Sequence, residues 1–184
     1  MRLAPLAALA LPVLAALGGC SWFSSSDSGP SLVCPNAYRV QEAASLVRFK
    51  PGAGKDPIDI LFQAQLGTLE TACRFSTREN YVDVTLNVQI LVAQGPTGTA
   101  DRANFEYAVG VLGPTGTPLQ RQRFATDVAF TINRNRGALT DEVRIRLPYN
   151  AENGASGYRI AVGLVLTPDE VDYNRRAAGT AGAR

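Results

Sequence analysis

The sequence predicts an all-β protein: an antiparallel β-sandwich of seven or eight strands, followed by one short C-terminal helix. Several segments alternate apolar and polar residues, which is typical of half-buried strands. Stretches rich in glycine and proline separate these segments, as in KPGAGKDP, QGPTGTAD, LGPTGTPL and NAENGASG. Many short strands with turn signals between them favour a sandwich.

Residues 1–19 have the three parts of an export signal. Arg2 supplies the positive charge, residues 3–17 are apolar, and two glycines follow at a cleavage point. The apolar run is shorter than the ~20 residues of a spanning helix, and two prolines interrupt it. A permanent transmembrane helix is therefore the weaker interpretation.

The segment LGGC, which ends at Cys20, resembles the lipobox of bacterial lipoproteins. The resemblance implies a diacylglycerol thioether on Cys20, cleavage before it, and acylation of the new amino terminus by a fatty acid such as palmitate. The alternative is a plain secretory signal with an accidental cysteine. By the lipoprotein sorting rule, Ser21 favours the outer membrane over the inner membrane. We therefore expect a lipid-anchored protein that faces the periplasm.

Residues 20–31 form the lipidated cysteine and a short polar tether. As a flexible coil, a tether of this length has ends roughly 20 Å apart. Trp22 and Phe23 are expected at the membrane interface, which aromatic side chains favour. We expect the sandwich to span residues 32–176 and a disordered tail to cover residues 177–184.

Two further cysteines, Cys34 and Cys73, remain for a disulfide, which forms and persists in an exported chain. Closing this loop contributes on the order of 4 kcal/mol in the chain-entropy model. The alternative is two buried free thiols. Neither cysteine belongs to a CxxC motif, so we expect no redox or metal role.

The clearest strand covers residues 81–92, because every second residue is apolar. Asp83, Thr85, Asn87 and Gln89 should face outward. The same alternation predicts strands over residues 57–66, 104–113, 127–133, 141–150 and 157–167, and weaker strands over 37–41 and 69–75. The predicted core residues are Ile58, Ile60, Phe62, Ala64, Leu66, Val82, Val84, Leu86, Val88, Ile90, Val92, Phe105, Tyr107, Val109, Val111, Val128, Phe130, Ile132, Val143, Ile145, Leu147, Tyr158, Ile160, Val162, Leu164 and Leu166.

Tyr158 follows a turn at the start of the last strand. This setting resembles the tyrosine corner of immunoglobulin-like and fibronectin-type sandwiches, which implies that fold. The helix follows that strand, with Thr167 at the N-cap, Pro168 at the first position and Glu170 in a capping box.

The whole mature chain is similar to a group of uncharacterised small lipoproteins of Gram-negative bacteria. The matching features are Cys34–Pro35, Cys73, the Phe–Tyr strand at 105–107 and the segment VGLVLTPDEVDYNRR. The similarity implies an envelope β-domain and brings no known activity with it.

The composition argues against an enzyme. The chain has no histidine, which excludes Ser–His–Asp and Cys–His catalysis and histidine-ligated metals. No spacing pairs the carboxylates as a hydrolase requires or forms an oxygen-ligand calcium loop. A formal net charge of +2 indicates no nucleic-acid partner. We expect no cofactor and no metal.

Arginines occur in pairs two residues apart, a spacing that puts both side chains on one face of a strand. They are Arg121 and Arg123, Arg134 and Arg136, and Arg144 and Arg146. One interpretation is a surface for lipid phosphates, lipopolysaccharide or an acidic partner. The other is the solvated face of a sandwich.

The sequence thus predicts a lipid-anchored, non-enzymatic binding or structural accessory module of the cell envelope with a protein partner. Strand addition at an exposed sheet edge is a suitable binding mode. The alternative is a module that binds a glycan or a lipid head group through the arginine pairs.

Overall fold

The computed structural model describes residues 32–52, 54–130, 135–149 and 154–181. This part of the chain contains eight strands, two 3₁₀ helices and one α-helix. The strands are β1 (Asn36–Arg39), β2 (Ser45–Phe49), β3 (Ile60–Ser76), β4 (Tyr81–Gln94), β5 (Arg102–Leu112), β6 (Pro118–Ala129), β7 (Arg136–Pro148) and β8 (Arg159–Leu164). The helices are η1 (Gln41–Ala43), η2 (Pro57–Asp59) and α1 (Pro168–Ala181).

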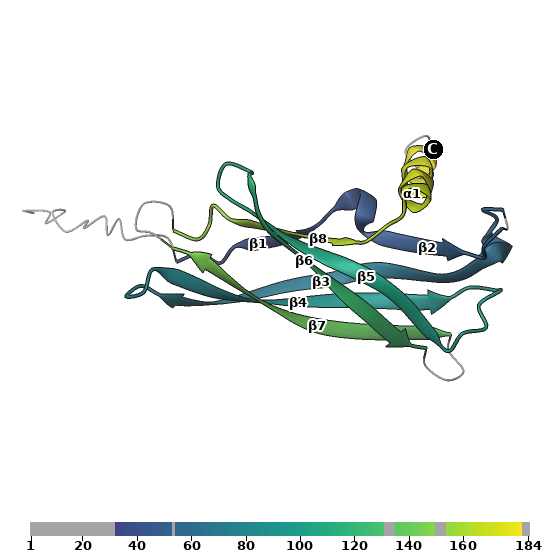
Figure 1. Ribbon diagram of the computed structural model, residues 1–184, viewed down its shortest axis with the longest axis horizontal. Coiled ribbons are helices and arrows are strands. Elements are labelled where there is room, and N and C mark those ends of the chain that lie inside the picture. The colour runs from purple at the N-terminus through teal and green to yellow at the C-terminus, as the bar shows by residue number, and fades with distance from the viewer. Residues whose placement is uncertain (1–31, 53, 131–134, 150–153, 182–184) are drawn as a thin grey trace, which may run out of the picture.

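The strands form two four-stranded sheets that pack face to face (Figure 1). The first sheet has the order β1-β8-β5-β6, and the second has the order β2-β3-β4-β7. Every pair is antiparallel except β1 and β8, which run parallel. The all-β sandwich with a C-terminal helix is confirmed. The strand order differs from the ABED and CFG sheets of immunoglobulin constant domains, so an immunoglobulin-like identity is not established.

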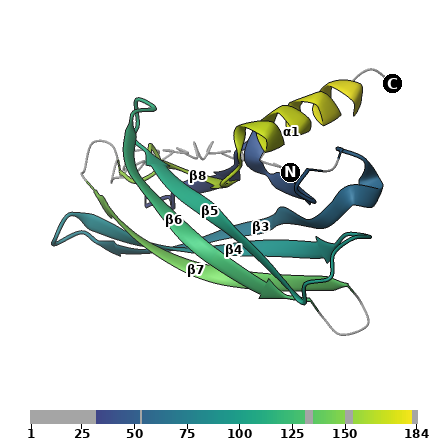
Figure 2. The same ribbon diagram turned by 45° about the vertical axis from the view of Figure 1, so that its right-hand side comes forward.

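The core lies between the two sheets and follows the predicted alternation. The even-numbered residues of β4 from Val82 to Val92 are all buried, and so are the predicted inward residues of β5. Val143 and Ile145 of β7 are buried beside exposed Arg144 and Arg146. The sheets cross at an angle, so they cover each other along a diagonal (Figure 2). The predicted faces of these strands are confirmed.

Strand β3 differs from the sequence prediction in its middle and just before its start. The two predicted strands, 57–66 and 69–75, are one strand of 17 residues with an irregular register between Leu66 and Leu69. The irregularity shifts the inward side from even to odd positions, because an extra residue reverses the pleat. Ile58 is not a core residue: it lies in η2 with 68% of its surface exposed.

Two further strands depart from the predictions. β2 is absent from the predicted strands because Ser45–Phe49 is short and has little alternation. The predicted strand over residues 127–133 is the end of β6, which begins at Pro118; Ile132 lies outside the described residues. Phe62, Phe130, Tyr158 and Leu166 are only partly buried and pack against the edge of the core.

Helix α1 begins with the predicted capping box. The Thr167 amide donates to Glu170 Oε2 at 2.8 Å, and the Glu170 amide donates to Thr167 Oγ1 at 3.3 Å. Arg48 of β2 donates to the second Glu170 oxygen at 2.8 Å, which ties the helix to the edge of the second sheet. The helix continues to Ala181, so the tail predicted to begin at residue 177 is helical in part. Ala177 and Ala178, which have the strongest helix propensity, favour this extension.

Candidate functional site

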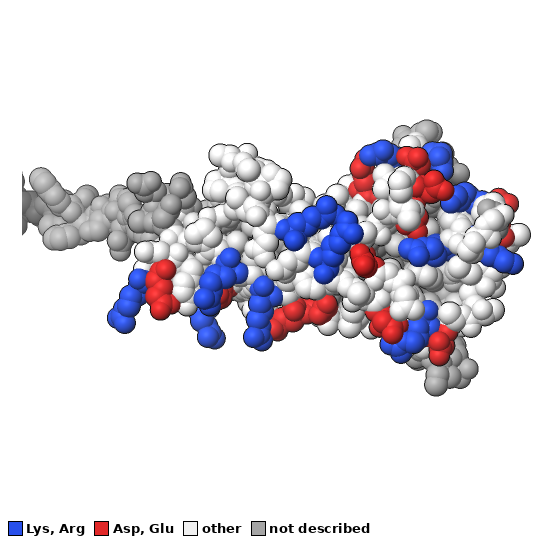
Figure 3. Space-filling view, viewed as in Figure 1, with Lys and Arg blue, Asp and Glu red and all other residues white. Residues whose placement is uncertain are grey.

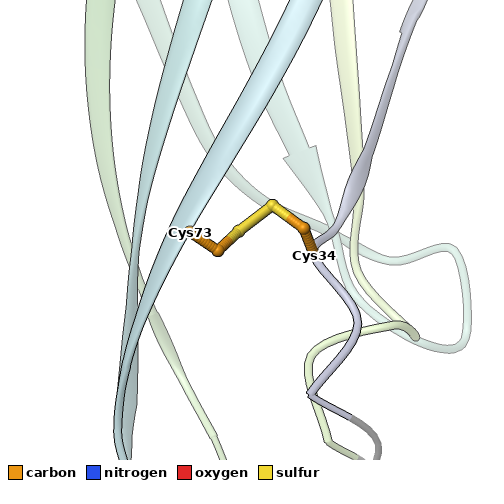
Figure 4. Close-up of a disulfide and its surroundings, with 2 residues drawn as sticks. All are labelled: Cys34 and Cys73. Atoms are coloured by element: carbon orange, nitrogen blue, oxygen red, sulfur yellow. A yellow bond between two sulfur atoms is a disulfide. The ribbon is translucent and has the colours of Figure 1, made fainter.

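Of the three predicted cysteine sites, the structure describes two. Cys20 lies outside the described residues. Cys34 and Cys73 form the predicted disulfide, with Cα atoms 5.7 Å apart (Figure 4). It joins the segment before β1 to β3, and therefore fastens the start of the domain to its longest strand.

The structure does not gather the arginine pairs into one surface. Arg121 and Arg123 lie on β6, opposite Gly110 and Ala108 on the outer face of the first sheet. The pair on β7 lies on the outer face of the second sheet. Arg136 is at the other end of β7, and Arg134 lies outside the described residues. A single basic surface made of all six residues is therefore not formed.

The β7 arginines are engaged with carboxylates. Arg146 Nε donates to Asp83 Oδ1 at 2.7 Å, and Arg144 Nε donates to Glu142 Oε1 at 2.9 Å. The Arg146 guanidinium also stacks over the Tyr81 ring, 4.1 Å from its centre. The hydrogen bond from Arg146 lowers the pKa of Asp83 below its ordinary value. Each guanidinium thus has an internal counter-ion.

These side chains line a hollow of about 660 Å³ on the outer face of the second sheet. Its charged lining is Arg74, Asp83, Glu142, Arg144 and Arg146, and the basic and acidic side chains alternate across neighbouring strands. Figure 3 shows basic and acidic side chains close together along the β7 side of the molecule. The two carboxylates offset two of the three arginines, so the hollow carries little net positive charge.

A second hollow, of about 550 Å³, lies at the opposite end of the same face. Its outward-facing residues include Val47, Gln63, Leu91 and Ala138, with Arg136 at the β7 side. Leu91 is 43% exposed, which leaves an apolar floor open to solvent. Within the described ranges, Arg136 has no ion pair.

One carboxylate, Asp141, points between the sheets and is not among the predicted core or site residues. The alternation of β7 could have predicted this position, because Asp141 lies two residues before the buried Val143 and so on the same, inward face. It accepts a hydrogen bond of 2.6 Å from the hydroxyl of the fully buried Tyr107. The Tyr107 ring stacks on Phe124, with centres 5.0 Å apart. Burial, and then the bond to Asp141, raise the pKa of Tyr107 far above its ordinary value.

The other candidate carboxylates of the described residues lie elsewhere or are engaged. Asp56 and Asp59 lie at η2, whereas Glu170 is held by its capping box and Arg48. In the portion of the chain that the structure describes, no three metal-ligating side chains come together.

Strand β6 combines an exposed first half with a partly buried second half. Its first six residues, 118–123, are exposed on both faces. It is the last strand of the first sheet, hydrogen-bonded to β5 on one side and to no other described strand on the other. Leu119 is 55% exposed. The segment PLQRQR lacks alternation for this reason, and a segment without alternation is not predicted as a strand.

Comparison with protein family models, with curated proteins and with solved structures finds no match. The function must therefore be argued from the surfaces of this chain. Among the helices that the structure describes, none has both the length and the apolar character needed to cross a membrane.

Proposed function

We propose that this chain is a lipid-anchored, non-enzymatic binding module of the cell envelope that faces the periplasm. Its domain binds a partner protein by accepting an extended segment at the free edge of β6. The observation that carries the proposal is a 12-residue edge strand whose first six residues are exposed on both faces.

The other three edges of the two sheets, β1, β2 and β7, are less suited to strand addition. β7 begins against the end of β6, and its inward residues Val143, Ile145 and Leu147 are buried in the core, so a partner would meet only one open face there. β1 has only four residues and follows directly after the disulfide. β2 is fastened to α1 through Arg48 and through Asn174, which donates to the Ser45 carbonyl at 2.8 Å. Natural sheets shorten or cover their edges to prevent unwanted pairing. The first half of β6 has neither protection among the described residues, so its backbone groups are open to a partner strand.

The anchor and the location rest on the leader. The lipobox ending at Cys20 and the following Ser21 support a lipoprotein of the outer membrane that faces the periplasm. The Cys34–Cys73 disulfide suits an oxidising compartment. Two acyl chains hold a protein stably on a bilayer, so the domain would act close to the membrane surface.

The alternative, a module that binds a glycan or a lipid head group through the arginine pairs, has weaker support. Arg144 and Arg146 each have a carboxylate partner within 2.9 Å, and Arg121 and Arg123 lie on the other sheet. An anionic head group would have to displace those carboxylates at one pair, and could not reach both pairs together.

Site-specific photocrosslinking in envelope preparations tests the proposal. A photoreactive residue replacing Gln122 should give a discrete crosslinked product, and the same residue replacing Thr140, on the outer face of β7, should not. A proline at position 121 should abolish a product formed from position 122. The odd-numbered residues of β6 do not hydrogen-bond to β5, so the amide of residue 121 faces the free edge, and proline lacks that backbone donor. Crosslinks from both faces alike, or from Thr140 alone, would contradict binding at β6.

A further inference from the structure

We infer that the strand accepted by β6 is acidic: an extended polypeptide segment with carboxylate side chains at alternate positions, paired with residues 118–125. This inference rests on the proposed strand addition and names the chemistry of the partner. Three observations support it: the charges along the free edge, the few ion pairs that these charges form, and the charges that a second copy of the chain would place opposite them.

The charges at the free edge are basic and poorly satisfied. Arg121 and Arg123 project from the same face of β6, and both are exposed. In the described part of the chain, Arg121 has no ion pair, and Arg123 approaches Glu106 only to 3.9 Å. An exposed pair at this distance contributes little. Figure 3 shows basic side chains over β5 and β6 beside a broad uncharged surface.

The neighbouring strand leaves these arginines without cross-strand side chains. Their register partners on β5 are Gly110 and Ala108, which carry no polar side-chain group. A strand added on the open side would place its side chains about 5 Å from those of β6, as cross-strand pairs require. Two carboxylates spaced by two residues would then face the two guanidinium groups directly.

The remaining exposed side chains of this edge are compatible with such a partner. Gln120 and Gln122 face the other side of the strand and are neutral, so they accept many residue types. Exposed Leu119 offers an apolar contact at the start of the strand. The edge therefore suits a segment that alternates acidic with apolar or neutral residues.

A second copy of this chain is a poor occupant. Antiparallel pairing of the free section with itself about Gln122 sets Arg121 against Arg123 twice, and like charges directly opposite are destabilising. The one acid farther along β6, Asp127, is held by Arg102 at 2.7 and 2.8 Å. Beyond it, the Ala129 carbonyl lies against Gly137 of β7, where the edge is covered.

The test uses two fluorescein-labelled peptides of ten residues, one alternating glutamate with valine and one alternating lysine with valine. Binding to the full chain is followed by fluorescence anisotropy, and the site by amide chemical shifts. We expect the acidic peptide to bind at least about tenfold more tightly, as two oppositely charged cross-strand pairs imply, and to weaken as salt rises. The shifts should concentrate on residues 118–125.

Charge reversal provides the matched control. The Arg121→Glu/Arg123→Glu variant should invert the preference between the peptides, and Arg144→Glu/Arg146→Glu on β7 should leave it unchanged. Arg121→Gln/Arg123→Gln should abolish the preference. This variant replaces the charge-reversal variant in the test if charge reversal impairs folding.

Three outcomes would overturn the inference. Equal binding of both peptides at β6 would reject the acidic partner and leave strand addition standing. Shifts confined to β7 would reject β6 as the site and the proposed function with it. Binding of neither peptide would reject an acidic strand, while photocrosslinking from position 122 would still decide strand addition.

Discussion

At the scale of single residues, Val88 shows how strictly β4 separates its two faces. Val88 is fully buried opposite Asp141, and Asn87 beside it faces outward. Val88→Asp buries an unpaired charge, and we expect it to cost several kcal/mol of unfolding free energy. Thermal and urea unfolding of the purified variant measures this loss.

The sequence alone suggests Asn87→Asp as a nearly silent control, but the register favours another choice. Asn87 lies between Glu70 of β3 and Glu142 of β7, so a third carboxylate there adds like-charge repulsion. Thr85 lies between Ala72 of β3 and Arg144 of β7, so a carboxylate at position 85 would lie opposite the Arg144 guanidinium. Thr85→Asp should therefore be close to neutral. A loss as large as that of Val88→Asp would contradict the assigned faces.

Tyr107 makes the stability of the fold sensitive to alkaline pH. Its pKa in the folded state is raised above the ordinary value of 10.0 by burial and by Asp141. The unfolded tyrosine ionises near its ordinary pKa while the folded one stays neutral. The stabilising contribution is therefore complete below about pH 10 and is lost as the pH rises above it.

We expect the unfolding free energy of the wild type to fall more steeply between about pH 9 and about pH 11 than that of Tyr107→Phe, which has no group to ionise there. Urea unfolding at several pH values gives both slopes. Parallel slopes would show that the Tyr107 hydroxyl does not govern this range. The variant should also be less stable at neutral pH, because Asp141 loses its 2.6 Å hydrogen bond.

At the scale of elements, the disulfide secures the shortest strand of the described chain. β1 has four residues and pairs with β8 alone among the described strands; besides the disulfide, Arg39 ties it to β3 by donating to the Leu66 carbonyl at 3.1 Å. Cys34→Ser/Cys73→Ser should lower the unfolding free energy by on the order of 4 kcal/mol in the chain-entropy model. Reduction of the wild type should approach the same value, and denaturant titration compares the two. A negligible loss would mean that the reduced chain keeps β1 in place.

The elements that can be predicted well from the sequence are those whose two faces differ. The alternation of β4, β5 and β7 and the capping box at Thr167 and Glu170 depend on neighbours within a few residues. The prediction divides β3 because its register irregularity reverses the alternation after Leu66. The first half of β6 escapes prediction because both of its faces meet water, and a strand without a buried face has no alternation to detect.

At the scale of the whole molecule, the anchor decides where the domain acts. Cys20→Ser should prevent labelling by a fatty-acid probe, because neither disulfide-bonded cysteine can replace the thiol. Metabolic labelling followed by membrane fractionation measures this, with Cys34→Ser/Cys73→Ser as the control that keeps its label. Equal labelling of the Cys20→Ser variant and the wild type would contradict the lipobox.

Local sequence is enough to predict the class of fold, the inward residues of most strands, the disulfide and the start of the helix. Each of these depends on local periodicity, on capping chemistry or on the small number of cysteines. The folded arrangement was needed to show that the arginine pairs of β6 and β7 lie on different sheets and that Asp141 meets Tyr107. It was also needed to show that the first half of β6 is a sheet edge without a covering element among the described residues. The physical reason is that strand order and edge positions arise from pairings between segments far apart in the chain, and alternation within one strand contains no information about its neighbours.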